Sequence, residues 1–217
     1  MITDVKYTSD HDRRELMPYL QQIKNNNGTI IDIGGDIKSF YSNDGFDIEN
    51  LRTAIVDFDI VDNSKINFTG NISLYKIWHE ILYYVNQNGL FDFCYASHIL
   101  EDISNPMLVC NMLSLIAKEG FIATPSKYAE SKRHGFPYRG YMHHRWIFDI
   151  KDKNFIGYPK QNFIEYVNIF DKLANQLNDE NRELQIYWKN EIKLNIINND
   201  FLGPTDKDIL EYYKRLL

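Results

Sequence analysis

The chain has 217 residues and a net charge of −6, from 24 Lys and Arg against 30 Asp and Glu. Its 44% hydrophobic and 25% charged composition is typical of a globular protein with an ordinary core, and it excludes a disordered or fibrous chain. An acidic chain without a block of Lys and Arg offers little to a phosphate backbone, so we expect no nucleic-acid partner.

The cysteines and the first residues bear on the cellular compartment. Cys94 and Cys110 each lie in an apolar stretch, which predicts buried, reduced thiols. Residues 1–15 lack the apolar core of a secretory signal. The longest stretch without a charge, residues 105–117, is too short to cross a bilayer. We therefore expect a cytoplasmic protein that does not bind membranes.

Helical and extended patterns alternate along the first 125 residues. The helices show apolar residues at a period of 3.6, and the strands are short β-branched or apolar runs that end at small or polar residues. We predict helices over residues 12–25, 74–86 and 105–118, and strands over residues 29–33, 53–58, 64–68, 91–96 and 120–124. This alternation predicts an α/β fold with a doubly wound, mostly parallel sheet.

The pattern changes after Pro125. Residues 126–144 form a long polar loop rich in basic and aromatic residues, and loops of this length are usually functional. We then predict an antiparallel hairpin of residues 146–150 and 155–158, a helix over 161–177, strands over 184–188 and 192–197, and a last helix from residue 205. The whole chain, residues 1–217, is predicted to be one domain, with an N-terminal helix over 10–26, a core over 29–159 and an appendage over 160–217.

Polar and small residues follow each of the first four predicted parallel strands. They are Asp32, Gly34 and Gly35, then Asp57 or Asp59, then Asn71, and finally Ser97 and His98. Open parallel sheets bind ligands beyond the carboxyl ends of their strands. An acid after the second strand is at the spacing that suits hydrogen bonds from ribose hydroxyls. The series predicts a nucleoside site.

The same segments resemble a known family. Ile30-Ile31-Asp32-Ile33-Gly34-Gly35, Ile55-Val56-Asp57, the run from Phe91 to Asp102, Pro106, and the run from Gly120 to Ser126 are similar to class I S-adenosylmethionine-dependent methyltransferases. The chain resembles a subgroup that pairs SH-x-LED, here residues 97–102, with HHRW, here residues 143–146. The resemblance implies a Rossmann-like methyltransferase fold and S-adenosylmethionine as cofactor, bound by Asp32, Gly34, Gly35, Asp57, Asn71 and Ser97.

The activity implied is methyl transfer to an oxygen or nitrogen of a small molecule or saccharide. His98 is the favoured candidate for the base that takes the proton of the acceptor, and His143 or His144 is the alternative. The loop over 126–144 is the expected acceptor lid, and Arg139, Tyr141, Arg145 and Trp146 are the expected acceptor-binding residues. If 143–146 is a strand, His143 and Arg145 share one side, and His144 and Trp146 the other.

Two other interpretations remain open. The loop after Gly35 lacks the third glycine of the family pattern and carries Phe40 and Tyr41. This departure is compatible with a methyltransferase-like protein that has lost catalysis and serves as a binding or scaffold protein. Zinc bound by His98, His143 and His144 is a further alternative. We predict no metal site, because neighbouring histidines on a strand cannot easily bind one ion.

Overall fold

The structure is a computed structural model that describes residues 1–10, 12–35, 48–58, 65–197 and 206–217. Its main sheet has seven strands. Five neighbouring strands are parallel, and the last two are antiparallel to their neighbours. The mostly parallel α/β sheet is therefore confirmed. In spatial order the strands are β4 (Ile66–Thr69), β3 (Ala54–Asp57), β2 (Ile30–Ile33), β5 (Phe93–Ser97), β6 (Glu119–Pro125), β9 (Glu183–Lys189) and β1 (Ile2–Thr8).

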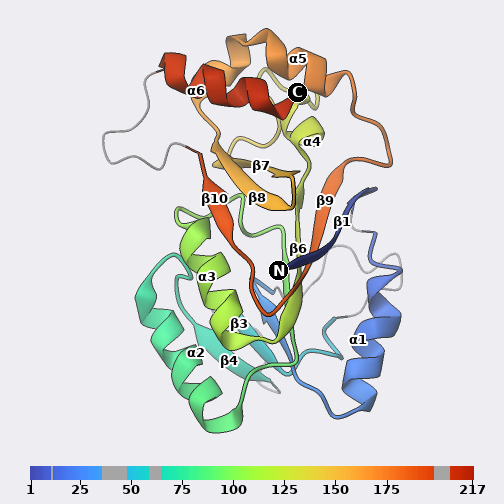
Figure 1. Cartoon of the computed structure of the whole chain (residues 1–217), viewed down its shortest axis with the longest axis vertical. Helices are drawn as coiled ribbons and strands as arrows, with labels where there is room; N and C mark the ends of the chain where they lie inside the picture. The colour runs from blue at the N-terminus through green and yellow to red at the C-terminus, as the bar shows by residue number, and fades with distance from the viewer. Residues whose placement is uncertain (11, 36–47, 59–64, 198–205) are drawn as a thin grey trace.

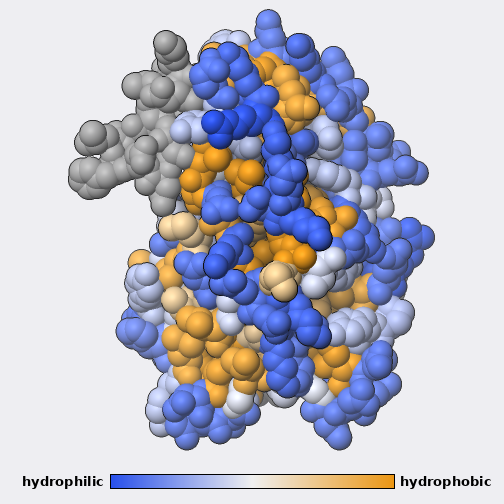
Figure 2. All heavy atoms as spheres, viewed as in Figure 1, coloured by the Kyte–Doolittle hydropathy of each residue, from blue (hydrophilic) through white to orange (hydrophobic). Residues whose placement is uncertain are grey.

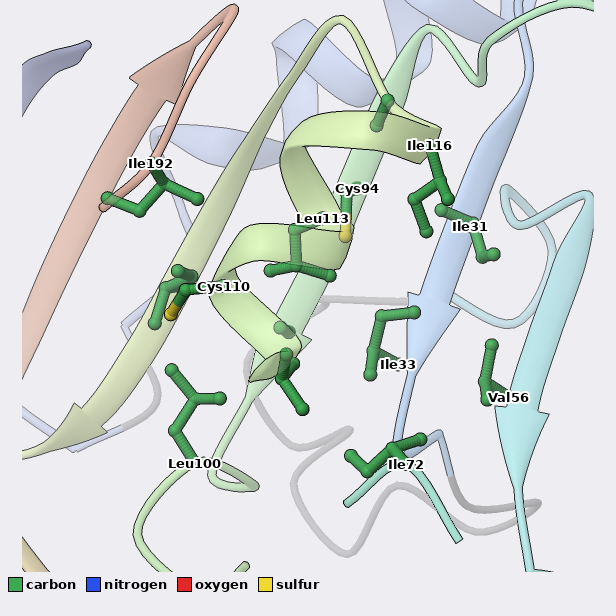
Figure 3. Packing of buried hydrophobic residues seen from close by; sticks show 14 of the residues in the cluster. Ile31, Ile33, Val56, Ile72, Cys94, Leu100, Cys110, Leu113, Ile116 and Ile192 are labelled. Carbon is green, nitrogen blue, oxygen red and sulfur yellow. The ribbon is translucent and has the colours of Figure 1, made fainter. Parts of the chain in front are cut away.

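Helices cover both faces of this sheet (Figure 1). Successive side chains of a buried strand point to opposite faces of the sheet. In β2, Ile31 packs with α2 (Tyr75–Asn88) and α3 (Pro106–Ile116), whereas Ile30 packs with α1 (Leu16–Asn25) on the other face. In Figure 3, Leu113 of α3 lies beside Cys94 of β5, and Cys110 lies on the side of Leu100 and Ile192. Both cysteines are buried and free, as predicted.

A second sheet has three strands, two of which precede β9 in the chain and one of which follows it. The predicted hairpin is confirmed as β7 (Trp146–Lys151) and β8 (Asn154–Pro159), which pair antiparallel. β10 (Leu194–Ile196) pairs parallel with β8. One apolar cluster joins β7 and β8 to the helical segments that surround them (Figure 1). These segments are α4 (Lys127–Ser131), a 3-10 turn (Asn162–Tyr166), α5 (Asn168–Ala174), α6 (Asp206–Tyr213) and a terminal 3-10 turn (Lys214–Leu216).

The structure differs from the expectations at three places. β1 is an unpredicted edge strand, because its apolar residues Ile2, Val5 and Tyr7 do not alternate regularly, are only partly buried and are separated by polar and charged residues. The helix predicted over 161–177 is interrupted at Val167, whose backbone is extended. The boundary drawn at residue 159 does not follow the sheets, since β9 lies inside the main sheet between β6 and β1.

The second sheet and its helices lie beyond the carboxyl ends of the parallel strands, because β6 ends at Pro125 and the chain enters α4 in that layer (Figure 1). In the view of Figure 2, apolar residues show over α2 and α3, and polar residues cover much of the face over α1. Within the described residues, none of the helices is both long and apolar enough to span a membrane.

Candidate functional site

The carboxyl ends of four adjacent strands bring the predicted ligand-binding residues to one edge of the sheet. β5, β2, β3 and β4 are neighbours in that order. Gly34 N–H donates to Val56 O at 2.8 Å, and Gly70 N–H donates to Asp57 O at 2.8 Å, so the ends are level. The chain order reverses between β2 and β5, which is where open α/β sheets bind ligands.

Gly34 and Gly35 are also required by packing within the protein. Gly34 has a φ of +77°, and a Cβ there would lie 3.0 Å from the Ile99 side chain. A Cβ on Gly35 would lie 2.2 Å from Asp32 Oδ2. The two glycines let the chain turn closely over the end of β2, whether or not a ligand is bound. Phe40, Tyr41 and Asp59 lie outside the described residues.

Asp32 is buried within the protein. Its carboxylate accepts a hydrogen bond from Arg52 Nη1 at 2.9 Å, and both side chains are buried. Burial raises the pKa of Asp32 to about 6, against the opposing effect of Arg52. Asp32, which the sequence predicts as a cofactor contact, thus forms an internal ion pair next to Gly35. Its partner Arg52 was not predicted.

Asp57 and Asn71 fit a nucleoside better. Asp57 is partly exposed at the end of β3, and one carboxylate oxygen accepts the Phe58 N–H at 2.5 Å. Asn71 Oδ1 accepts the Ser73 N–H at 2.8 Å in the turn before α2. The amide nitrogen of Asn71 remains a donor, and its oxygen has a second lone pair. The Asp57 carboxylate can accept hydrogen bonds from a ribose beside β3, and the Asn71 amide can donate to or accept from a base beside β4.

His98 follows β5 in a left-handed backbone conformation, with a φ of +52°. Its Nε2 lies 2.6 Å from Glu183 Oε2, and its Nδ1 lies 3.2 Å from Glu101 Oε1. Burial alone would lower the pKa of His98, but the two carboxylates outweigh it and raise the pKa to about 10. The ring is therefore an imidazolium at neutral pH, which cannot accept a proton.

Arg13 completes this charged group. Its guanidinium, which is buried, pairs with both oxygens of Glu183 and donates to Ser97 Oγ at 2.9 Å. Burial opposes the ionisation of Glu183, but His98 and Arg13 lower its pKa to about 2. Sequence reasoning missed Arg13 and Glu183, because they come from the segment before α1 and the start of β9. No local pattern connects them to Ser97 or His98.

The two motifs of the predicted subgroup contact one another. Arg145 N–H donates to Glu101 O at 2.6 Å, and Trp146 Nε1 donates to Ile103 O at 2.8 Å. The strand begins only at Trp146, so the predicted alternation of His143 and His144 between two faces is wrong. Both residues precede β7, and both imidazoles approach the same carboxylate.

That carboxylate is Asp102. Its Oδ1 lies 3.7 Å from His143 Nε2 and 3.6 Å from His144 Nε2. On its other side, the buried His144 ring places Nδ1 2.5 Å from Glu130 Oε1. Lys160 Nζ pairs with Glu130 Oε2 at 2.6 Å. Glu130 and Lys160 were not predicted, since a short helix and the end of β8 bring them together only in the fold.

Arg139 and Tyr141 differ in their availability to an acceptor. Arg139 is 3% exposed, and its guanidinium donates to Ile164 O, Ser131 O and Asp171 Oδ1 at 3.1, 3.1 and 2.6 Å. These hydrogen bonds fix residues 126–144 to the 3-10 turn at Ile164 and to α5 at Asp171, so the guanidinium predicted to bind the acceptor is engaged inside the protein. Tyr141 is 44% exposed, and its ring packs on His144 with centroids 4.7 Å apart.

A cavity of about 580 Å³ opens beside the 143–146 segment. Pockets of this volume suit small ligands. His98 and Gly34 are not among its lining residues. The lining includes polar, cationic and apolar residues, which are Ser104, Met142, His143, His144, Arg145, Trp146, Pro159, Lys160 and Gln161.

Similar folds occur among solved structures. They include an S-adenosylmethionine-dependent methyltransferase from Archaeoglobus fulgidus, at 12% identity and a TM-score of 0.39, over 81% of this chain and 94% of that one. The methyltransferase domain of bacterial CtHen1 has 11% identity and a TM-score of 0.41, over 83% and 99%. The small RNA methyltransferase HEN1 has 10% identity and a TM-score of 0.42, over 87% of this chain but 27% of that one. No protein-family model and no curated protein matches the sequence.

Proposed function

We propose that this protein transfers a methyl group from S-adenosylmethionine to an oxygen or nitrogen of a small molecule or saccharide. The observation that carries the proposal is the level edge at which Gly34, Asp57, Asn71 and Ser97 follow four adjacent strands. The glycine turn at Gly34, the partly exposed acid Asp57 and the amide of Asn71 lie side by side along this edge. This order suits a nucleoside that carries a charged tail.

The roles of the cofactor-binding residues follow from their positions. Asp57 would accept hydrogen bonds from the ribose hydroxyls, and Asn71 would contact the adenine edge. The backbone at Gly34 and Gly35 would approach the methionine portion. S-adenosylmethionine supplies a sulfonium methyl group that is displaced in line. The protein then mainly aligns donor and acceptor and excludes water.

The acceptor would enter from the cavity beside the 143–146 segment. Arg145 offers positive charge to a polar or anionic acceptor, and Trp146 offers an apolar ring. His98 is unsuited as the base, because Glu101 and Glu183 hold it as an imidazolium. His143 is 68% exposed and lines the cavity, so the geometry favours the His143 and His144 pair for handling the acceptor.

Binding of S-adenosylmethionine and S-adenosylhomocysteine by isothermal titration tests this proposal. Asp57→Ala should weaken binding about 10-fold or more, the expected loss for hydrogen bonds to a carboxylate. His79→Ala, an exposed position on α2, is the matched control and should bind as the wild type does. The proposal fails if neither ligand binds at millimolar concentration, or if Asp57→Ala and the wild type bind equally.

A second candidate function, binding or scaffolding without turnover, is favoured by the state of His98. Both of its ring nitrogens face carboxylates, so the residue after β5 takes no proton at neutral pH. This alternative predicts that the protein binds the cofactor but never forms S-adenosylhomocysteine with any acceptor offered. Mass spectrometry of the cofactor after incubation with acceptor pools distinguishes the two functions.

A further inference from the structure

We infer that Asp102, His143 and His144 form a binding site for a divalent transition-metal ion. One oxygen of Asp102 and one nitrogen from each imidazole lie within 4.8 Å of one another. The residues come from the loop after β5 and from the segment before β7, which the Arg145 and Trp146 hydrogen bonds hold together. The inference concerns a separate site and does not depend on the cofactor.

The distances match the spacing of ligands around one ion. Asp102 Oδ1 lies 3.6 and 3.7 Å from the two Nε2 atoms, which is too far for hydrogen bonds. Ligands at about 2.1 Å from a tetrahedral ion lie about 3.4 Å apart. Asp102 Oδ1 is moreover a buried oxygen with no hydrogen-bond partner in the structure. Such an atom is costly to bury unless a cation or donor reaches it.

The contacts of His144 orient it as a ligand. Its Nδ1 lies 2.5 Å from Glu130 Oε1, which suits a proton on Nδ1 and leaves the lone pair of Nε2 directed at Asp102. A cation between Nε2 of His144 and Oδ1 of Asp102 would then be bound by both atoms. Metal-binding histidines commonly bond a carboxylate through the second nitrogen in this way. Lys160 neutralises the remaining charge of Glu130.

Open coordination positions would face the cavity. His143 and His144 both line it, so an ion bound to them can also contact a molecule there. Two imidazoles and one carboxylate suit zinc, cobalt, manganese or iron(II) better than magnesium, which prefers oxygen ligands. Such an ion would position an acceptor oxygen and make its proton more acidic. Neither histidine is in β7, so the opposite directions of neighbouring strand side chains do not keep His143 and His144 from sharing an ion.

Metal titration of the chelator-treated full chain tests the inference. We expect one Zn²⁺ or Co²⁺ per chain by isothermal titration, with weaker binding of Mg²⁺, and visible absorption bands from bound Co²⁺. His143→Ala, at an exposed side chain, and Asp102→Asn, which keeps the shape, should each weaken binding by about 100-fold or more. Glu130→Gln, which keeps the size but not the charge, should weaken it about 10-fold to 100-fold. Circular dichroism verifies that each variant is folded.

The control is His79→Ala, which removes an exposed histidine on α2 and should leave metal binding unchanged. Less than one ion bound for every five chains, or equal affinities of wild type, His143→Ala and Asp102→Asn, would overturn the inference. A loss of binding in His79→Ala that equals the loss in His143→Ala would also overturn it. Metal binding without S-adenosylmethionine binding would leave the metal site standing and reject only the proposed function.

Discussion

The charged residues around the end of β5 are largely buried and neutralise one another through ion pairs. Arg13, Glu183 and His98 form a chain of ion pairs that ends at Glu101. Each member alone would be expensive to bury, and together they fix the backbone after Ser97. We interpret His98 as a positioning residue that holds the loop leading to Asp102, in place of the base that sequence reasoning favours.

The His98 interaction should make stability depend on pH. Its pKa is raised from 6.5 to about 10 in the folded protein, so its contribution is fully present below pH 6.5 and is lost as pH rises toward about 10. His98→Asn, which tolerates the positive φ, should lower the unfolding free energy at pH 6.5 by about 2 kcal/mol. Urea denaturation at pH 6.5 and pH 9.5 measures both effects.

The same experiment contains its own control. In His98→Asn the difference in unfolding free energy between the two pH values should shrink, since the titrating ring is gone. A variant with the same pH dependence as the wild type would show that His98 does not carry it. His79→Ala, which removes an exposed imidazole on α2, should keep the wild-type dependence.

At the scale of elements, α3 is the clearest case of a helix whose position the sequence predicts. Asn105 accepts a hydrogen bond from Leu108 N–H at 3.1 Å, and Pro106 occupies the first turn. The sequence marks this start and the Gly120 that follows, but α3 is apolar nearly all round. Its buried face could not be read from periodicity, because Leu113 and Leu115 have the same chemistry.

Those two leucines make a matched test of the packing of α3. Leu113 is 0% exposed among residues of β2 and β5, whereas Leu115 is 52% exposed (Figure 3). Leu113→Ala should lower the unfolding free energy by about 2–5 kcal/mol, because it leaves a cavity in the core. Leu115→Ala should change it by less than about 0.5 kcal/mol. Equal losses in urea denaturation would contradict the assignment of faces.

The polar residues at the strand ends could be predicted from local sequence, whereas the buried ion pairs could not, because they join distant segments of the chain. Gly34, Asp57, Asn71 and Ser97 each follow a short apolar run, so a local pattern marks them. The contact between Arg13 and Glu183 spans 170 residues of chain and depends on β9 entering the main sheet beside β6. No periodicity encodes such a contact.

The same limit explains the result at 143–146. The start of β7 at Trp146 agrees with the predicted hairpin, but the docking of Arg145 on Glu101, a contact between distant segments, was not predicted. The turn before β7 is what brings His143 and His144 to one carboxylate. The residues of this cluster were therefore predicted in part, but their arrangement was not.

At the scale of the whole molecule, the two sheets divide the proposed work. The edge of the main sheet at Gly34 and Asp57 would bind the cofactor, and the layer of β7, β8 and α4 beyond it would bind the acceptor (Figure 1). The loop from Ser97 to Asp102 links the two, because it starts at the carboxyl end of β5 and ends against the 143–146 segment.

A crystal structure of the protein with S-adenosylhomocysteine tests this account most directly. The account predicts that both ribose hydroxyls lie within about 3.2 Å of the Asp57 carboxylate and that the methionine portion lies over Gly34 and Gly35. The sulfur should then face the loop that carries His98 and Asp102. A nucleoside bound away from Asp57, or one bound only in the cavity beside Lys160, would contradict it.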